Sequence, residues 1–335
     1  MRLVDIRQRT PEWERWRSEG VTASEAPIVL GVSPYKTPWR LWAERVGLVR
    51  PEDLSGNPHV KRGVALEDTA RQAFEARFGT LLLPVCGESD THPVLRASFD
   101  GITDQGSPVE LKAPSQGTWA ELCRERESAP AFRLYYPQLQ HQLYVAGAEL
   151  GWLAFYFAGE LEVFEVRRDE PLLVTLLERA LAFWEAVTTR REPERDPARD
   201  LYVPSGEALA HWTALAAEYR ALAEVAEGHE QALTAVKGAL DDLEGTLVDL
   251  MGAFVVGEAA GLKVTRYLQS GAVDYKAALK ALVPELAAET LERYRRKSAE
   301  RVRVTVLTEE KASVPVTMAP VTGEVEAPAR HSFFF

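Results

Sequence analysis

The amino-acid sequence predicts an α/β or α+β core followed by a mainly helical C-terminal extension. Short apolar or alternating runs bounded by turn residues, which are typical of strands, cluster between residues 80 and 168, and segments of helical periodicity stand before, between and after them. After residue 206, apolar residues recur at spacings of three and four, which is typical of long amphipathic helices. The 335 residues, 46% of them hydrophobic, suffice for about two domains.

Four helical segments are expected before the first strand. In the second segment Thr22 or Ser24 can cap the helix that the following apolar residues form, and Gly79 stops the fourth. The four segments are residues 11–19, 20–31, 33–47 and 61–79.

Five strands are expected next, with one helix between the third and fourth strands and another after the fifth. The helix between them contains the run "YYPQLQHQLYVAGA", residues 135–148, and the helix after them covers 170–190. The strands are expected at residues 80–86, 94–103, 107–114, 151–159 and 160–168.

We expect three regions along the chain: residues 1–195, residues 196–310 and a disordered tail at 311–335. The linker "REPERDPARD" separates the first two, and the tail mixes Pro, Ala, Thr and Ser without periodicity.

The second region should begin with a long amphipathic helix or with a helical hairpin broken near Gly228. A strand (261–268), a helix from about Asp274 and a strand (301–307) should follow. The apolar positions of the first segment are Leu209, Trp212, Leu215, Tyr219, Leu222, Val225, Leu233, Val236, Leu240, Leu243, Leu247 and Leu250.

Charge and composition exclude several classes of protein. The net charge of −11 argues against coating DNA through bulk charge, although residues 1–50 carry nine Lys/Arg and six Asp/Glu, a net of +3. There is no apolar run of membrane-spanning length and no secretory signal at the start of the chain. Two cysteines without a CxxC pair make a zinc or iron–sulfur site improbable, and a reducing cytoplasm is the expected location.

The run "SFDG", residues 98–101, and the run "VELK", residues 109–112, flank a turn signal and predict a hairpin. If the turn centres on Gln105, Asp100 stands opposite Glu110, and Lys112 shares a strand face with Glu110. Two facing carboxylates are destabilising unless a cation compensates them, and Mg²⁺ or Mn²⁺ suits such oxygen ligands. The residues alone leave another interpretation open, in which Glu110 and Lys112 form a solvated ion pair at a strand end and Asp100 is a turn residue.

Two further segments can contribute to this cluster. Glu67 lies in the helix before the hairpin, where it is either a further carboxylate of the site or an exposed acid. Downstream, Gln138, His141 and Gln142 stand among apolar residues of one helix. A glutamine on a buried helix needs a polar partner, although a surface amide is the competing interpretation.

The order of Glu67, "SFDG", "VELKAP" and "PQLQHQLY" resembles the PD-(D/E)XK nuclease superfamily. The start "EWERWRSEGVTASEAPIVLG" makes the resemblance narrower, to the YqaJ-like viral recombinase or lambda exonuclease family. The resemblance covers roughly residues 9–195 and implies a restriction-endonuclease-like core, in which helices flank a mixed central sheet. The run "ELKAP" departs from the family's frequent "ELKCP", but the replaced cysteine has no assigned chemistry.

The resemblance also implies roles for single residues. Asp100, Glu110 and the carbonyl of Leu111 would bind Mg²⁺, for which Mn²⁺ could substitute. Lys112 would orient the attacking water. The remaining roles are a carboxylate at the metal site for Glu67, the family's helix glutamine for Gln138, and binding of the terminal 5′-phosphate for Arg17 and Ser24.

The activity implied is a 5′-to-3′ exonuclease acting on double-stranded DNA ends and leaving 3′ single strands for an annealing protein. A homotrimer is implied as well. An endonuclease of the same superfamily and a catalytically silent DNA-end-binding scaffold remain as alternatives. In the extension, the basic run around Arg295, Arg296 and Lys297 could contact the DNA backbone or could cap a helix.

Overall fold

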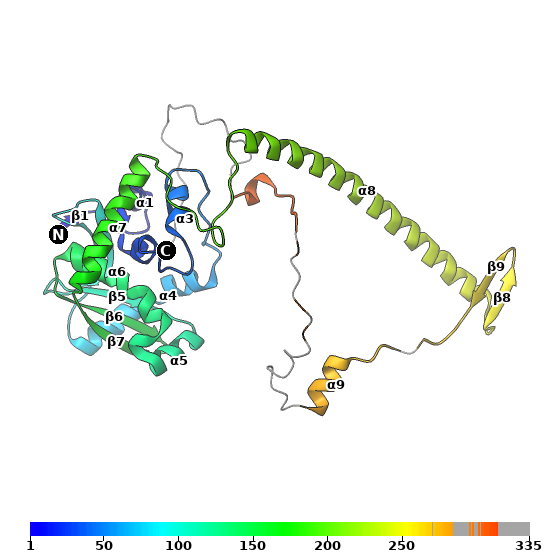
Figure 1. Ribbon diagram of the computed structural model, residues 1–335. Helices are drawn as coiled ribbons and strands as arrows, with labels where there is room; N and C mark the ends of the chain where they lie inside the picture. Colours follow the sequence, from blue (N-terminus) through cyan, green and yellow to red (C-terminus); the bar gives the residue numbers. More distant parts are fainter. Residues whose placement is uncertain (270, 284–294, 296, 298–300, 302, 314–335) are drawn as a thin grey trace. The chain divides into compact units, whose positions relative to one another are not determined.

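The computed structural model describes residues 1–335 except 270, 284–294, 296, 298–300, 302 and 314–335 (Figure 1). The chain divides into two compact units. The first comprises residues 1–203 and the chain from residue 308, and the second is Pro204–Leu307. None of the helices described is long and apolar enough to span a membrane.

The first unit is built on one mixed sheet in the order β1-β3-β4-β5-β6-β7 (Figure 1). The neighbours in this order are antiparallel except β5 and β6, which are parallel, and β2 adds a parallel pairing with β4. The predicted mixed α/β architecture is therefore confirmed. The strands are β1 (Arg2–Val4), β2 (Val21–Thr22), β3 (Leu83–Glu88), β4 (Leu95–Ile102), β5 (Pro108–Lys112), β6 (Leu150–Phe157) and β7 (Glu160–Arg167).

Helices cover both faces of this sheet. On β5, Val109 and Leu111 pack against Ala70 and Phe74 of α4, whereas Glu110 between them is bonded by α6. Because side chains alternate along a strand, α4 and α6 lie on opposite faces. The helices are α1 (Pro11–Ser18), α2 (Ala26–Val29), α3 (Pro38–Arg45), α4 (Pro58–Phe78), α5 (Gln116–Glu125), α6 (Pro130–Ala146) and α7 (Glu170–Thr188).

The ends of α4 follow from local chemistry. The Asn57 side chain accepts a hydrogen bond from the backbone nitrogen of His59, and Pro58 occupies the first helical position. At the other end Gly79 adopts the left-handed conformation, with φ 64°, that terminates a helix without steric cost to glycine. This helix brings Glu67 toward the sheet.

The largest apolar cluster packs helices α2, α3, α6 and α7 around β4. Trp39, Phe99 and Leu176 are among its fully or almost fully buried members. A second cluster joins α5 and α6 to β6 and β7 through Leu122, Leu139 and Phe155. Helix α6 therefore contacts two cores, which fixes the position of the side chains that it presents to β5.

Several predicted boundaries differ from the structure. The helix predicted at 135–148 begins at Pro130, because that proline occupies the first helical turn, where its missing N–H costs nothing. Strand β3 begins at Leu83 and runs to Glu88, where it pairs with β1. Helix α5, which Ser115 caps through the backbone nitrogen of Thr118, was not anticipated.

The second unit contains α8 (Gly206–Leu250), a hairpin of β8 (Val256–Ala259) and β9 (Leu262–Thr265), and α9 (Tyr275–Leu282). Helix α8 is continuous through Gly228 (Figure 1), so the first of the two alternatives for this segment holds. Helix α9 begins at the predicted cap, where Asp274 accepts from the backbone nitrogen of Ala277. The strand predicted at 301–307 is wrong for the residues described there, 301 and 303–307, which have no strand pairing.

Of the tail predicted at 311–335, the structure describes residues 311–313. The carbonyl of Ser313 accepts a hydrogen bond of 2.7 Å from the backbone nitrogen of Arg50. The part from residue 314 lies outside the described residues.

Candidate active site

The hairpin of β4 and β5 has the register expected from a turn centred on Gln105. Gly101 pairs with Val109 and Ile102 pairs with Pro108. The regular pairing of the two backbones ends at Gly101 and Val109. Beyond it, a side chain rather than a backbone carbonyl accepts the hydrogen bond of the β5 backbone. The Asp100 carboxylate accepts a hydrogen bond of 2.9 Å from the backbone nitrogen of Leu111. The two strands thus diverge at Asp100, and their polar side chains meet at the fork.

Glu110 is the most buried acid of this cluster, with 2% of the residue exposed. Gln138 donates to its Oε1 atom and Gln142 donates to its Oε2 atom, both at 2.6 Å. These two glutamines are four residues apart on α6, so they share one helix face. A buried carboxylate with both oxygens hydrogen-bonded is held in one orientation.

Lys112 completes the contacts of Glu110. Its Nζ atom forms an ion pair with Oε1 of Glu110 and lies 4.5 Å from the centre of the Tyr135 ring. Burial works against the charged ammonium, but the negative charge of Glu110 outweighs it and raises the pKa of Lys112 above its ordinary value. The lysine therefore stays protonated beside Glu110.

The same surroundings disfavour the charged form of Asp100. Burial, followed by the negative charge of Glu110, raises the pKa of Asp100 to about 8. The two carboxylates repel each other when both are charged. A hard divalent cation, which accepts oxygen ligands of this kind, would relieve that repulsion. The carboxylates of Asp100 and Glu110 and the carbonyl of Leu111 are the oxygen donors for such an ion.

Glu67 reaches this cluster through arginine. Its carboxylate forms ion pairs with Arg9 and, at 2.9 Å, with Arg71. Arg71 also donates to the backbone carbonyl of Asp100 at 3.1 Å. The negative charge of Glu67 contributes to the raised pKa of Asp100. Among the described residues, no group of three or more Asp, Glu, His or Cys side chains lies close enough to hold a metal ion. In this arrangement a metal at the fork would therefore have two carboxylate ligands.

Arg17 and Ser24, predicted to bind a terminal phosphate, lie side by side. Arg17 donates to Oγ of Ser24 at 2.9 Å, and its guanidinium stacks 4.5 Å from the centre of the Trp13 ring. Burial lowers the pKa of Arg17. Both residues line a cavity of about 70 Å³, whose wall also carries Lys36 and Arg45.

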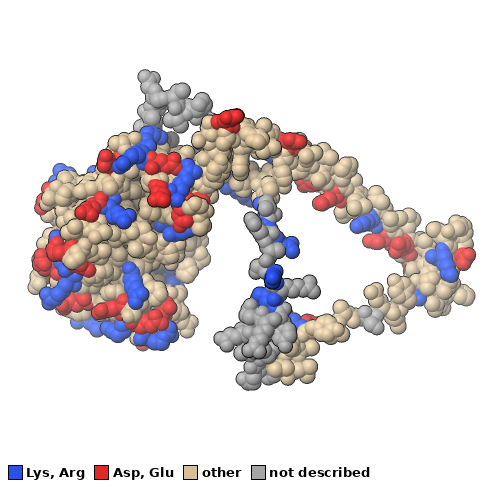
Figure 2. All heavy atoms as spheres, in the orientation of Figure 1, with Lys and Arg blue, Asp and Glu red and all other residues tan. Residues whose placement is uncertain are grey.

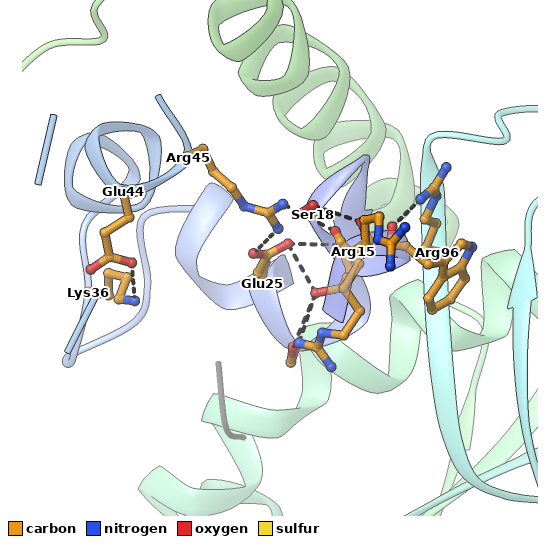
Figure 3. A network of polar contacts seen from close by, with 11 residues as sticks. Arg15, Ser18, Glu25, Lys36, Glu44, Arg45 and Arg96 are labelled. Carbon is orange, nitrogen blue, oxygen red and sulfur yellow. Dashed lines mark hydrogen bonds and ion pairs between the residues drawn. The ribbon is translucent and has the colours of Figure 1, made fainter. Parts of the chain in front are cut away.

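An ion pair in the wall of this cavity was not anticipated from the sequence. Arg45 contacts Oε1 of Glu25 at 2.5 Å and donates to the backbone carbonyl of Arg17 at 3.1 Å (Figure 3). The other Glu25 oxygen accepts from the backbone nitrogen of Thr22 at 2.9 Å. Burial opposes ionisation of Glu25, but the charge of Arg45 prevails and lowers the pKa of Glu25. The spacing of Thr22 and Glu25 is that of a capping box, a signal that could have identified this acid.

The remaining predicted residues lie in the second unit. Arg295 and Lys297 are described without helix or strand, and Arg296 lies outside the described residues. Their contact with DNA stays a prediction. Gln142 is the opposite case, because it bonds Glu110 as directly as Gln138 does but was only noted as a buried amide. The spacing of four between these glutamines was the available signal.

Part of the first unit is similar in sequence to a known domain family. Residues 12–149 match the model of the YqaJ-like viral recombinase domain, which confirms the resemblance seen in the motifs. All the predicted site residues except Arg295, Arg296 and Lys297 lie within this range. The chain is 28% identical over 179 residues to the uncharacterized protein YqaJ of Bacillus subtilis (strain 168), which covers 52% of this chain and 54% of that protein. The match thus spans about half the length of this curated relative.

Two solved structures are also similar to the chain. An alkaline exonuclease from Laribacter hongkongensis is 22% identical, with a TM-score of 0.47, over 54% of this chain and 94% of that one. A phage-related exonuclease from Haemophilus somnus 129PT is 15% identical, with a TM-score of 0.40, over 51% of this chain and 96% of that one.

Proposed function

We propose that this chain is a metal-dependent deoxyribonuclease that degrades linear double-stranded DNA from its 5′ ends and leaves 3′ single strands. The observation that supports it best is the fork at Asp100, where Glu110 and Lys112 meet two glutamines of α6. The YqaJ-like domain around this fork supports the substrate class. An annealing protein that takes up the single strands and assembly as a homo-oligomer belong to the same proposal.

In this proposal Asp100, Glu110 and the Leu111 carbonyl hold Mg²⁺, for which Mn²⁺ can substitute, with Glu67 as a neighbouring carboxylate. The bound ion would lower the pKa of a water molecule and neutralise charge on the phosphate. Gln138 and Gln142 keep the Glu110 carboxylate in one orientation, so that its oxygens need not reorganise during the reaction. The ammonium of Lys112 donates a hydrogen bond to the attacking water and orients it.

The cavity beside Arg17 supplies the preference for an end. A guanidinium presents two parallel N–H groups to phosphate oxygens, and the Ser24 hydroxyl adds a third donor. Burial of Arg17 strengthens its interaction with an anion, because little water screens the charges there. A 5′-phosphate bound in this cavity would position the first phosphodiester bonds of the strand for cleavage.

The test is digestion of a linear duplex labelled separately at its 5′ and 3′ ends, with Mg²⁺ or with EDTA, beside closed circular DNA. We expect Mg²⁺-dependent loss of the 5′ label, an intact circle and no activity for Asp100→Ala. Cutting of the circle would instead identify an endonuclease. If wild-type protein binds DNA ends but cleaves nothing with any divalent metal, the protein is a DNA-end-binding scaffold.

A further inference from the structure

Helix α8 carries a seam with a seven-residue repeat that is apolar except for His229 at one d position. If Tyr219 is numbered as position a of the heptad, one register from Leu215 to Leu250 places most of the large apolar residues at positions a and d. Trp212 is a further a position. The a positions are Tyr219, Ala226, Leu233, Leu240 and Leu247, and the d positions are Leu215, Leu222, His229, Val236, Leu243 and Leu250.

A seven-residue repeat is informative because it does not match a straight helix. The α-helix has 3.6 residues per turn, so a heptad seam drifts by about 20° per repeat around a straight helix. Over the roughly five heptads from Leu215 to Leu250 the seam would turn by about 100°. The seam stays on one face only if the helix coils around another helix of similar length. A flat surface or a short helix would not select this repeat.

The seam is exposed along α8. Leu215, Leu222, Leu233, Val236, Leu240 and Leu243 are each more than half exposed. Uncharged surface runs along much of the drawn face of the helix (Figure 2). An apolar stripe of this length on a soluble helix marks a contact surface.

The other described elements of this unit are too short to cover the seam. The 45 residues of α8 span about 67 Å, whereas the eight residues of α9 span about 12 Å, and β8 and β9 have four residues each. The next longest described helix is α4, with 21 residues, and its apolar side chains pack on the sheet of the first unit. Among the described elements, α8 is therefore the one helix long enough to serve as the partner.

We propose that α8 pairs with α8 of a second copy of this chain in a parallel two-stranded coiled coil. Heptads contribute four contacting positions each, so the seam from Leu215 to Leu250 would supply about 20 side chains per helix, within the range of stable interfaces of about 20–30 residues a side.

The charges beside the seam are compatible with this pairing. In a parallel pair each e position meets the g position of the preceding heptad of the other helix. The charged e residues are Glu230, Lys237 and Glu244, and they would meet Val225, Ala232 and Ala239. No two like charges face each other in these contacts. This pairing surface is separate from the proposed nuclease site and goes beyond the proposed function.

The first test compares native masses of the full-length protein by analytical ultracentrifugation. The double variant Leu222→Glu/Val236→Glu places charges at two d positions, and the matched control Ala221→Glu/Ala235→Glu places the same charges at the adjacent c positions, which point away from the seam. We expect the d variant to have half the mass of the wild type and the control to keep the wild-type mass. A wild type that is monomeric (37.3 kDa) or trimeric, or an unchanged mass of the d variant, would overturn the proposal. In the last case association would occur elsewhere in the chain.

A second test does not depend on the folding of a charged variant. In a Cys123→Ser background, which removes the exposed native thiol, Ala226→Cys puts a thiol at an a position where a parallel pair brings the two copies together. Ala235→Cys is the control at a c position. Mild oxidation should link most of the Ala226→Cys chains into covalent dimers and leave the control chains single. Absence of the Ala226→Cys dimer would rule out the parallel pair. Both readouts are independent of DNA cleavage, so they can fail or succeed separately from the nuclease proposal.

Discussion

The Gln142 amide nitrogen lies 2.6 Å from Oε2 of Glu110, across the carboxylate from the nitrogen of Gln138. The other end of the same amide, the Gln142 oxygen, is buried without a hydrogen-bond partner among the described residues. In this orientation the Gln142 oxygen accepts no hydrogen bond, while the Gln142 nitrogen donates to Glu110, so that both oxygens of the Glu110 carboxylate are hydrogen-bonded. Gln142 is therefore placed as a positioning residue of the proposed active site.

Replacement of Gln142 by Leu should slow the reaction more than it weakens substrate binding. A hydrogen bond to a buried charged group contributes about 1.5–3 kcal/mol, so we expect kcat to fall by roughly one to two orders of magnitude with little change in KM. The control is Gln140→Leu, since Gln140 is equally buried on α6 but bonds the Arg167 carbonyl instead. An equal fall in kcat for both variants would mean that Gln142 only stabilises the helix.

Arg17→Ala should abolish the preference for 5′-phosphorylated over 5′-hydroxyl ends. Loss of a charge-assisted contact to phosphate should reduce that ratio of kcat/KM by roughly tenfold or more. Arg15→Ala removes an exposed arginine from the same helix, α1, and should leave the ratio as it is. A wild-type ratio in the Arg17 variant would remove this cavity from end recognition.

The acidic pair predicts a stability difference that metal should reverse. In EDTA, Asp100→Asn removes the cost of burying this carboxyl group beside Glu110, so its melting temperature should exceed that of the wild type by a few degrees. Added Mg²⁺ or Mn²⁺ should raise the melting temperature of the wild type and change that of the variant little, because ligand binding to the folded state stabilises it. Differential scanning calorimetry measures both effects. An identical response of the two proteins to metal would exclude Asp100 as a ligand.

His141 should make the protein sensitive to mild acid. Burial lowers the pKa of His141 to about 4, and its Nε2 atom has no hydrogen-bond partner among the described residues. The unfolded chain takes up this proton at about pH 6.5 and the folded chain only near pH 4, so the contribution of His141 is present above pH 6.5 and is lost as the pH falls toward 4. The loss amounts to about 3 kcal/mol over that interval.

Urea unfolding of wild type and His141→Gln between pH 7 and pH 4.5 measures this contribution. The variant should lose less free energy of unfolding than the wild type over that interval. His211→Gln changes an exposed histidine of α8 and should follow the wild type. Parallel curves for wild type and His141→Gln would show that His141 takes no part in acid sensitivity.

Local signals predicted local features of the fold. The turn at Gln105 determined the register of Gly101 with Val109, and the cap at Asp274 determined the start of α9. Both depend on residues a few positions apart, where turn and capping chemistry acts directly. The strand predicted at 301–307 failed because no strand in the described part of the chain pairs with residues 301 and 303–307, and a strand needs a neighbour to bond.

Contacts between distant segments could not be predicted in the same way. The side chains of Arg45 and Glu25 meet across 20 residues, and Arg9 meets Glu67 across 58. Such pairs depend on how α1, α3 and α4 pack around the sheet. The spacing of apolar residues along the sequence does not predict that packing.

The parallel pairing of β5 with β6 has a consequence for synthesis on the ribosome. Glu110 leaves the ribosome well before Gln138 and Gln142, which follow it by 28 and 32 residues, and before the neighbouring strand β6. A nascent chain that stops short of α6 therefore holds its acidic strand without the donors that orient Glu110, and closing such a long connection is a slow step of folding. A chain that ends before β6 lacks the strand that pairs with β5, and one that ends before α6 also lacks the donors to Glu110, so we expect neither to cleave DNA in the proposed way.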